Sequence, residues 1–334
     1  MTSAIVILAA GKGARMKSNL PKVLHPLAGR PMIAYSLDLA RTLSDLPPVV
    51  IVGHKAEEVM AAVGDGTIFV EQTEQLGTGH AVMQAEAALA GRAETVMVYA
   101  ADMPLLTSAT LQRLQATHAD RGAAITMLSV IAEDPRGFGR VVRGEDGSAR
   151  AIVEEIEATE EQKAIRELNA GVYCFDAAWL WPALHRLQPS PRKGEYYLTD
   201  LVGLAVADGR RVEVVTTETP EEALGVNTRA HLAEAEAVMR RRVNRALMLS
   251  GVTLMDPDAT YIQPQVRVGR DTTIGPGAVL RGDTVLGEGC EIGPHAVLTD
   301  VHAGDRVVIG AGALATGCHF PDDADIPPGS ILTG

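Results

Sequence analysis

Two glycines and two cations follow the first apolar run of the chain. Gly11 and Gly13 stand directly behind that run, Arg15 comes next, and Lys22 follows seven residues later. Glycine lets the backbone pass close to a bulky ligand and leaves amide N–H groups pointing outward, which suits phosphate oxygens. Arg15 and Lys22 add positive charge where a triphosphate can lie. This spacing predicts a loop that binds the phosphates of a nucleotide.

Two better-known glycine motifs do not fit the same stretch. A dinucleotide-binding turn needs a third glycine at the position that Met16 occupies. A P-loop ends in Gly-Lys-Ser/Thr, but Gly11-Lys12 is followed by Gly13. On spacing alone, the stretch is either a tight turn between a strand and a helix or a nucleotide loop of another kind.

The elements that must position this loop alternate between strand and helix. Short apolar runs at 4–9, 48–52, 67–70 and 95–99 predict buried strands, and helical spacing predicts helices at 31–43, 55–63 and 81–89. Such alternation indicates a mainly parallel sheet with helices on both faces.

Three polar loops each follow one of these predicted strands. They are residues 10–22, residues 71–79 and the turn at Asp102. In open parallel sheets, ligands bind beyond the carboxyl ends of the strands. We therefore expect the three loops to converge on one crevice.

The last third of the chain has a different pattern. Ala, Glu and Arg dominate a long helix expected from about Arg229 to Leu249, which indicates a connector exposed on one side. After Gly251, apolar residues recur every six positions, at Val268, Ile274, Leu280, Leu286, Ile292 and Leu298. This hexapeptide repeat predicts a β-helix solenoid. Its register slips between Leu298 and Ile309, where we expect an irregular corner.

Composition limits the possible partners and the compartment. A chain of 334 residues is long enough for two domains, and its net charge of −12 disfavours nucleic acid and anionic membranes as partners. Cys174, Cys290 and Cys318 form no C-x-x-C pair and are expected as buried free thiols in a reducing compartment. No stretch approaches membrane-spanning length, so we expect a cytoplasmic protein.

Several motifs together resemble one bacterial enzyme family. They are LAAGKGARM with PKVLHPLAG, EQLGTGHA, GFGR, IVEE, LNAGVY, GEYYLTD and GVN. The set resembles the bifunctional N-acetylglucosamine-1-phosphate uridylyltransferases/glucosamine-1-phosphate acetyltransferases. The resemblance implies an α/β, Rossmann-like nucleotidyltransferase domain at 1–228, a linker helix at 229–250 and a short left-handed β-helix at 251–334. It implies UTP and N-acetylglucosamine 1-phosphate as substrates.

The resemblance also implies roles for individual residues. Arg15, Lys22 and Asp102 are the expected catalytic residues, with Arg15 and Lys22 neutralising the nucleotide phosphates. Asp102 and Asn227 are expected to share a Mg²⁺ ion, since this hard cation prefers oxygen ligands. The expected nucleotide-binding residues are Leu8, Ala10, Gly11, Gly13, Gln72, Gly77 and Thr78, of which the last three face uracil and ribose. The expected sugar-binding residues are Gly139, Glu154, Asn169, Tyr197 and Thr199.

The sequence departs from the family pattern at several points. Ile156 stands where many members carry a lysine, and Asp102-Met103-Pro104 is also similar to the nucleotidyltransferases of molybdenum-cofactor biosynthesis. Four or five coils of hexapeptides fit between residues 251 and 334, and none of that stretch matches the acetyltransferase motifs. The resemblance implies a homotrimer assembled through the β-helix, and because the acetyltransferase motifs are missing from this stretch we expect no acetyl transfer.

Three functions compete on the sequence. The first is the Mg²⁺-dependent uridylyltransferase that the resemblance implies. The second keeps the reaction but changes the nucleobase or the sugar 1-phosphate. The third is a catalytically silent scaffold whose solenoid mediates assembly. Because Arg15, Lys22, Asp102 and Asn227 are all present, the sequence favours an enzyme over the scaffold.

Overall fold

The computed structural model describes residues 2–334 and divides into two compact units. The first unit contains the residues up to His25 together with Pro31–His231, and the second contains Pro26–Arg30 together with Leu232–Gly334. The short segment at residues 26–30 therefore groups with the C-terminal part of the chain. No helix in the described residues is both long enough and apolar enough to cross a membrane.

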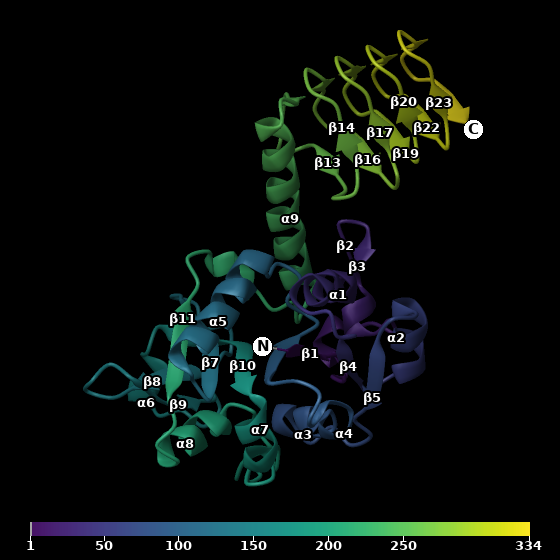
Figure 1. Ribbon diagram of the computed structural model, residues 1–334. Helices are drawn as coiled ribbons and strands as arrows, with labels where there is room; N and C mark the ends of the chain where they lie inside the picture. The colour runs from purple at the N-terminus through teal and green to yellow at the C-terminus, as the bar shows by residue number, and fades with distance from the viewer. Residues whose placement is uncertain (1) are drawn as a thin grey trace. The chain divides into compact units, whose positions relative to one another are not determined.

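A nine-stranded mixed sheet forms the centre of the first unit (Figure 1). Its main path runs β11-β7-β10-β6-β1-β4-β5. Off this path, β8 pairs with β10, and β9 pairs with β8. β10 runs antiparallel to β6 and β7, whereas β1, β4, β5 and β6 run parallel to one another. The strands are β1 (Ser3–Leu8), β4 (Val49–Val52), β5 (Ile68–Glu71), β6 (Thr95–Ala100), β7 (Ile125–Ile131), β8 (Arg140–Arg143), β9 (Ala149–Val153), β10 (Glu167–Asp176) and β11 (Val212–Thr216).

Helices cover both faces of this sheet, as the alternation of elements predicted. Val6 of β1 belongs to one buried cluster, and its neighbours Ile5 and Ile7 belong to the other, because successive side chains of a strand point to opposite faces. One cluster includes residues of α1 (Met32–Leu43), α2 (Ala56–Val63) and α5 (Ser108–Arg121). The other includes residues of α3 (Thr78–Met83), α4 (Glu86–Leu89), α7 (Ala177–Leu184) and α8 (Asp200–Ala207).

The helix predicted at 81–89 is wrong in its extent. The segment forms two short helices, α3 and α4, and the first of them begins three residues earlier, at Thr78. Thr78 lies in the loop that the sequence placed beside the ligand. The start of α3 therefore belongs to the wall of that crevice.

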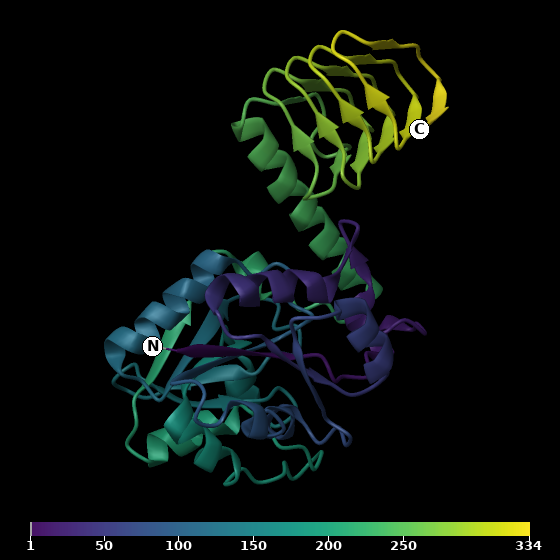
Figure 2. The ribbon, with the colours of Figure 1, turned by 45° about the vertical axis from the view of Figure 1, so that its right-hand side comes forward.

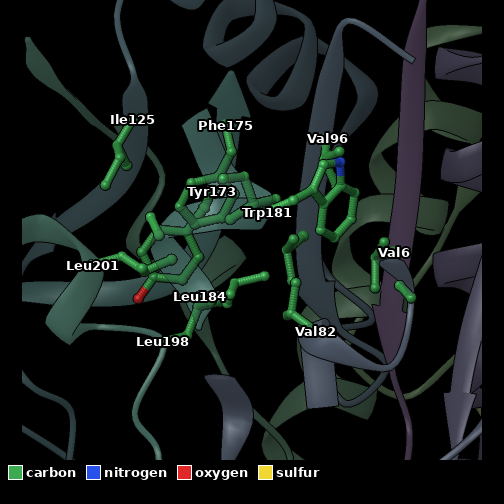
Figure 3. Packing of buried hydrophobic residues seen from close by; sticks show 14 of the residues in the cluster. Val6, Val82, Val96, Ile125, Tyr173, Phe175, Trp181, Leu184, Leu198 and Leu201 are labelled. Carbon is green, nitrogen blue, oxygen red and sulfur yellow. The ribbon is translucent and has the colours of Figure 1, made fainter. Parts of the chain in front are cut away.

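A buried apolar cluster packs against α7 and α8 and holds the segment that precedes α8 (Figure 3). Leu198 points into this cluster with Leu184 and Leu201, and all three are at most 2% exposed. Tyr173 and Phe175 of β10 stack with their ring centroids 5.5 Å apart. Since Leu198 is fixed in this way, the backbone of residues 197–199 has a defined position.

The second unit is a left-handed β-helix of stacked coils (Figure 2). Its three parallel sheets have five, five and four strands. The first is β12 (Thr253–Leu254), β15 (Thr273–Ile274), β18 (Glu291–Ile292), β21 (Val308–Ile309) and β24 (Asp325–Ile326). The second is β13 (Tyr261–Ile262), β16 (Val279–Arg281), β19 (Val297–Thr299), β22 (Leu314–Thr316) and β25 (Ile331–Thr333). The third is β14 (Arg267–Val268), β17 (Val285–Leu286), β20 (His302–Ala303) and β23 (His319–Phe320).

Glycine follows four of the apolar repeat residues, at Gly269, Gly275, Gly287 and Gly293, and each of these glycines lies against the next coil. A Cβ atom on Gly293 would lie 2.4 Å from the backbone nitrogen of Ala311, and one on Gly275 would lie 2.7 Å from that of Pro294. Both distances are shorter than any real contact of a Cβ atom. Coil-to-coil approach therefore explains the small-residue part of the hexapeptide pattern.

The register slip lies where the sequence predicted an irregular corner. A six-residue repeat would pair Leu286 with residue 304, but Leu286 pairs with Ala303. The corner between β19 and β20 is therefore one residue shorter than the corresponding corner of the preceding coil. The three cysteines are free and buried, as expected.

A helix covers the first coil of the solenoid. Asn244 of α9 (Arg229–Leu249) is 1% exposed, and its Nδ2 donates to the carbonyls of Pro257 and Thr260 at 2.7 and 2.9 Å. Val243 and Leu247 pack against the interior of the solenoid. Stacked repeats need such a cap, because the end coil otherwise leaves its apolar interior open to water.

Candidate active site

The three loops that the sequence singled out line one cleft in the first unit. The cleft has a volume of about 910 Å³ and lies at the carboxyl ends of β1, β5 and β6. β4 and β6 flank β1 on opposite sides, so the chain reverses its direction of travel across the sheet at β1. Such a switch point is where open α/β sheets bind ligands. The predicted site residues on its surface are Leu8, Ala10, Gly11, Lys22, Gln72, Gly77, Thr78, Asp102, Glu154 and Tyr197.

Gly13 brings Lys22 to the cleft by allowing a close approach. Its φ of 60° is left-handed, and a Cβ atom there would lie 2.6 Å from Cβ of Lys22. Met16, at the end of the 3₁₀ turn Ala14–Met16, is 1% exposed and anchors the loop to the first unit. Arg15 lies on the same turn and is exposed.

The ammonium of Lys22 joins two oxygen groups from distant parts of the chain. It forms an ion pair with the Asp102 carboxylate and donates to Oδ1 of Asn227 at 3.1 Å. The N–H of Val226 donates to the carbonyl of Asp102 at 2.8 Å, so the two segments are also tied through their backbones. Lys22 and Asp102 each have a side-chain exposure of 15%, which leaves both accessible from the cleft.

Asp102 and Asn227 offer oxygen atoms of the kind that Mg²⁺ prefers, and both contact Lys22. Their oxygens already meet at one cationic atom, Nζ of Lys22. Among the described residues, no cluster of three or more His, Cys, Asp or Glu side chains could hold a metal. One carboxylate and one amide hold Mg²⁺ only together with water and substrate phosphates. The pair therefore fits an ion that arrives with a nucleotide.

The loop after β5 is tied to the segment before α8. Gly79 N–H donates to the carbonyl of Tyr196, Tyr196 N–H donates to that of Leu76, and Thr78 Oγ1 accepts the N–H of Leu198 at 3.0 Å. A Cβ atom on Gly77 would lie 2.6 Å from the Tyr196 oxygen. Because of this close contact, the predicted nucleotide and sugar residues form one continuous wall.

Half-buried Glu154 and buried Thr199, two of the predicted sugar residues, form a hydrogen-bonded pair beside the cleft. The Thr199 hydroxyl donates to Oε1 of Glu154 at 2.9 Å. Burial raises the pKa of Glu154 above its ordinary value, although the Thr199 hydrogen bond acts in the opposite direction. A half-buried carboxylate with a second free oxygen is suited to accept hydrogen bonds from sugar hydroxyls.

Asn169 sits at an irregularity of β10. The register of β10 against β7 shifts between Asn169 and Tyr173, and Asn169 Nδ2 donates to the Tyr173 hydroxyl at 2.6 Å. The Asn169 N–H donates to the carbonyl of Gly139 at 2.9 Å, which places these two predicted sugar residues side by side. Irregularities of this kind often re-aim side chains next to active sites.

Six of the predicted residues lie behind or beside the cleft surface. They are Gly13, Arg15, Gly139, Asn169, Thr199 and Asn227. Thr199 and Asn227 each bond a residue that lines the cleft, Glu154 and Lys22 respectively. Gly13 and Gly139 allow close packing, since a Cβ atom on Gly139 would lie 2.8 Å from Cγ2 of Ile152.

Sequence reasoning missed several residues that line the cleft. They are Ala9, Val23, Gln75, Ala81, Ala100, Gly137, Glu155, Lys163, Arg192, Lys193 and Glu195. Ile156, which stands where many family members carry a lysine, lines the cleft as well. Arg140 was also missed; it is 1% exposed and donates to Glu155 at 3.1 Å, which fixes the turn after β9. The paired cations before GEYYLTD were a visible signal, but a charged pair in a loop is usually no more than a solvated surface.

Comparison with known proteins places the chain in a family. The model of the MobA-like NTP transferase domain matches residues 5–178, and that of the bacterial transferase hexapeptide repeat matches residues 265–300. The bifunctional protein GlmU of Heliobacterium modesticaldum is 46% identical over 327 residues, which cover 98% of this chain and 71% of that protein. The bifunctional protein GlmU of Trichlorobacter lovleyi is 46% identical over 338 residues, covering 99% and 74%. The chain is thus a nucleotidyltransferase and belongs to the family of bifunctional GlmU proteins.

Proposed function

We propose that the first unit transfers a uridylyl group from UTP to N-acetylglucosamine 1-phosphate, giving UDP-N-acetylglucosamine and pyrophosphate. The observation that carries this proposal is the Lys22–Asp102–Asn227 cluster, which stands in the same cleft as the Gln72 loop and the Glu154–Thr199 pair. Together they supply phosphate, base and sugar contacts in one continuous site.

In this reaction, an oxygen of the sugar phosphate attacks the α-phosphorus of UTP. A new P–O bond forms there while the bond to the β-phosphate oxygen breaks, and pyrophosphate leaves with that electron pair. Lys22 and Arg15 neutralise the charge that grows on the phosphate oxygens, and the amide groups at Ala10 and Gly11 face the same charge. Positioning and electrostatic stabilisation account for the catalysis, so no covalent intermediate on the protein is needed.

We propose that Asp102 and Asn227 hold Mg²⁺ when the nucleotide is bound. The ion supplies Lewis-acid polarisation of the phosphate oxygens. Lys22 must then turn its flexible side chain from the metal ligands toward the phosphates. Its unbranched stem and accessible ammonium permit this movement.

For the sugar subsite, we propose that Glu154 accepts hydrogen bonds from ring hydroxyls. Thr199 keeps one oxygen of Glu154 occupied, and Tyr197 lines the wall beside it. Asn169 and Gly139 stand behind that wall and set its shape.

We propose that the second unit assembles the protein as a homotrimer. One outward column of its second sheet is apolar and in register, made of Tyr261, Val279, Val297, Leu314 and Ile331. The neighbouring outward column is polar, with Arg281, Thr299, Thr316 and Thr333. The outward column of the first sheet is mostly polar, with Thr253, Thr273, Glu291, Val308 and Asp325. An exposed apolar column on each copy favours closed symmetric association.

A panel of nucleotides and sugar phosphates tests the proposal. UTP, CTP, dTTP, ATP and GTP are each offered with N-acetylglucosamine 1-phosphate, glucose 1-phosphate and glucosamine 1-phosphate, with and without Mg²⁺, and pyrophosphate is measured. We expect UTP with N-acetylglucosamine 1-phosphate to give the highest kcat/KM and to require Mg²⁺. A clear preference for another base or sugar contradicts the substrate assignment.

The same polypeptide allows the acetyl-transfer expectation to be tested. We propose that residues 1–334 do not transfer an acetyl group from acetyl-CoA to glucosamine 1-phosphate. Release of free coenzyme A that depends on glucosamine 1-phosphate contradicts this part of the proposal.

A further inference from the structure

His80 holds the side chain of Gln72 from behind the cleft. Gln72 is 3% exposed, and its amide nitrogen lies 3.0 Å from the carbonyl oxygen of Gly77 and 3.1 Å from Nδ1 of His80. The carbonyl of Gly77 can only accept a hydrogen bond, so the end of the Gln72 amide that faces it must be the NH₂ group. The Gly77 carbonyl therefore fixes the orientation of the Gln72 amide.

The tautomer of His80 follows from the same geometry. The second hydrogen of the Gln72 NH₂ group points to Nδ1 of His80, which must therefore accept and carry no hydrogen. A neutral imidazole then carries its hydrogen on Nε2, which lies 3.1 Å from the side-chain amide of Gln84. The Gln84 nitrogen also lies 3.1 Å from the carbonyl oxygen of His80, so both amides present NH₂ to the ring and one of them must turn. Gln84 is half-buried and can exchange that hydrogen bond for one to water, whereas Gln72 is 3% exposed and cannot. The Gln84 amide therefore turns and presents its oxygen to Nε2.

The network leaves only one group of Gln72 for a ligand. Both hydrogens of its nitrogen are engaged by Gly77 and His80, whereas Oε1 has no partner among the described residues. Gln72 lines the cleft, so it can offer a base a hydrogen-bond acceptor and no donor. At ring position N3, uracil carries a hydrogen and cytosine does not.

We infer that His80 is a positioning residue that sets the base preference of the enzyme by committing both hydrogens of Gln72. This inference rests on the proposed function, in which Gln72 faces the uracil. Without the acceptor at Nδ1, one N–H of Gln72 is free to turn toward the ligand and to donate to N3 of cytosine. Loss of His80 therefore relaxes the selection of UTP over CTP.

The kinetic test compares two variants of the full chain. His80→Phe keeps a planar ring but removes the acceptor, and His80→Asn places an amide oxygen close to the position of Nδ1. For each, kcat/KM is measured with UTP and with CTP at saturating N-acetylglucosamine 1-phosphate and Mg²⁺. We expect the UTP/CTP ratio to fall by about tenfold or more in His80→Phe and to stay within about threefold of the wild-type ratio in His80→Asn. An unchanged ratio in His80→Phe, or an equal fall in both variants, overturns the inference.

A spectroscopic measurement on the wild-type protein separates this inference from the proposed function. With histidine labelled by ¹⁵N, NMR reports which ring nitrogen of His80 carries the hydrogen, and His80→Asn assigns the signal. We expect hydrogen on Nε2 and none on Nδ1; a hydrogen on Nδ1 overturns the inference whether or not the protein is active. Conversely, absence of pyrophosphate release with every substrate pair contradicts the proposed function and leaves the NMR result to decide the tautomer.

Discussion

At the scale of single residues, Lys22 is the cation on which the proposed chemistry depends most. We expect Lys22→Ala to lower kcat/KM by about a hundredfold or more, because a charge aimed at developing phosphate charge acts mainly in the transition state. We also expect a smaller reduction in stability, because the substitution removes its ion pair with Asp102. Pyrophosphate release and the thermal midpoint, measured together, separate the two effects.

Lys55→Ala is the matched control for this substitution. Lys55 also forms an ion pair, with Glu58 at 3.0 Å, but it does not line the cleft. We expect its removal to leave kcat/KM nearly unchanged. Wild-type kcat/KM in Lys22→Ala, with a lowered midpoint, would show that Lys22 is structural.

The half-buried carboxylate Glu154 links the proposed sugar subsite to pH. Since burial raises its pKa in the folded protein, the folded state binds more protons than the unfolded state between the ordinary and the raised value. Ionised Glu154 therefore lowers the free energy of unfolding as the pH rises through that window, and the loss is complete above it. Glu154→Gln removes the titration and keeps an acceptor for the Thr199 hydroxyl.

We expect Glu154→Gln to be more stable than the wild type above that window and to lose the advantage below it. The KM for N-acetylglucosamine 1-phosphate should rise by about tenfold, because a neutral amide accepts weaker hydrogen bonds than a carboxylate. Urea unfolding across the pH range and the KM check the two halves. A stability difference that does not change with pH contradicts the burial argument.

At the scale of elements, the solenoid depends on glycines that face the next coil. We expect Gly293→Ala to destabilise the second unit by about 1–3 kcal/mol, because its Cβ atom meets backbone rather than a movable side chain. Gly312→Ala is the control for backbone strain alone: nothing lies within 4 Å of its Cβ atom, but its φ of 67° is left-handed and costs about 1 kcal/mol. Equal thermal shifts in the two variants would refute the role of coil contacts.

Helices and strands were predicted best from the sequence where one pattern of apolar residues continues along the chain. Every hexapeptide position from Val268 to Leu298 falls on the interior of the solenoid, and the run AIVILA predicted β1 because a strand buried on both faces is continuously apolar. The α3–α4 break was missed, because apolar spacing at residues 81–89 carries no signal for a turn near Ala85. The shift in β10 was missed for a similar reason, since it depends on pairing with β7.

The candidate site was predictable only where short motifs carry it. Residue types in short motifs pointed to Lys22, Gln72 and Asp102, which do share a cleft. Contacts between distant segments, such as Thr199 with Glu154 or His80 with Gln72, depend on how strands and loops are placed in space. Only the three-dimensional structure makes these contacts visible.

At the scale of the whole molecule, the apolar outward column of the second sheet is the proposed trimer contact. We expect Leu314→Glu to shift the protein from a trimer to a monomer in light scattering at micromolar concentration, because it buries a charge against an apolar face. Val308→Glu makes a similar change on the first sheet, where neighbours are polar, and should remain a trimer. A monomeric wild type, or equal dissociation in both variants, contradicts the assignment of this face.

The central claim concerns the product that this polypeptide makes. The most direct measurement incubates the purified chain with UTP, N-acetylglucosamine 1-phosphate and Mg²⁺ and identifies the products by mass spectrometry, with Asp102→Asn run in parallel. We predict UDP-N-acetylglucosamine and pyrophosphate in equal amounts, and at least about a hundredfold slower formation in the variant. Absence of UDP-N-acetylglucosamine from the wild-type reaction, or its formation by Asp102→Asn at the wild-type rate, would contradict the account.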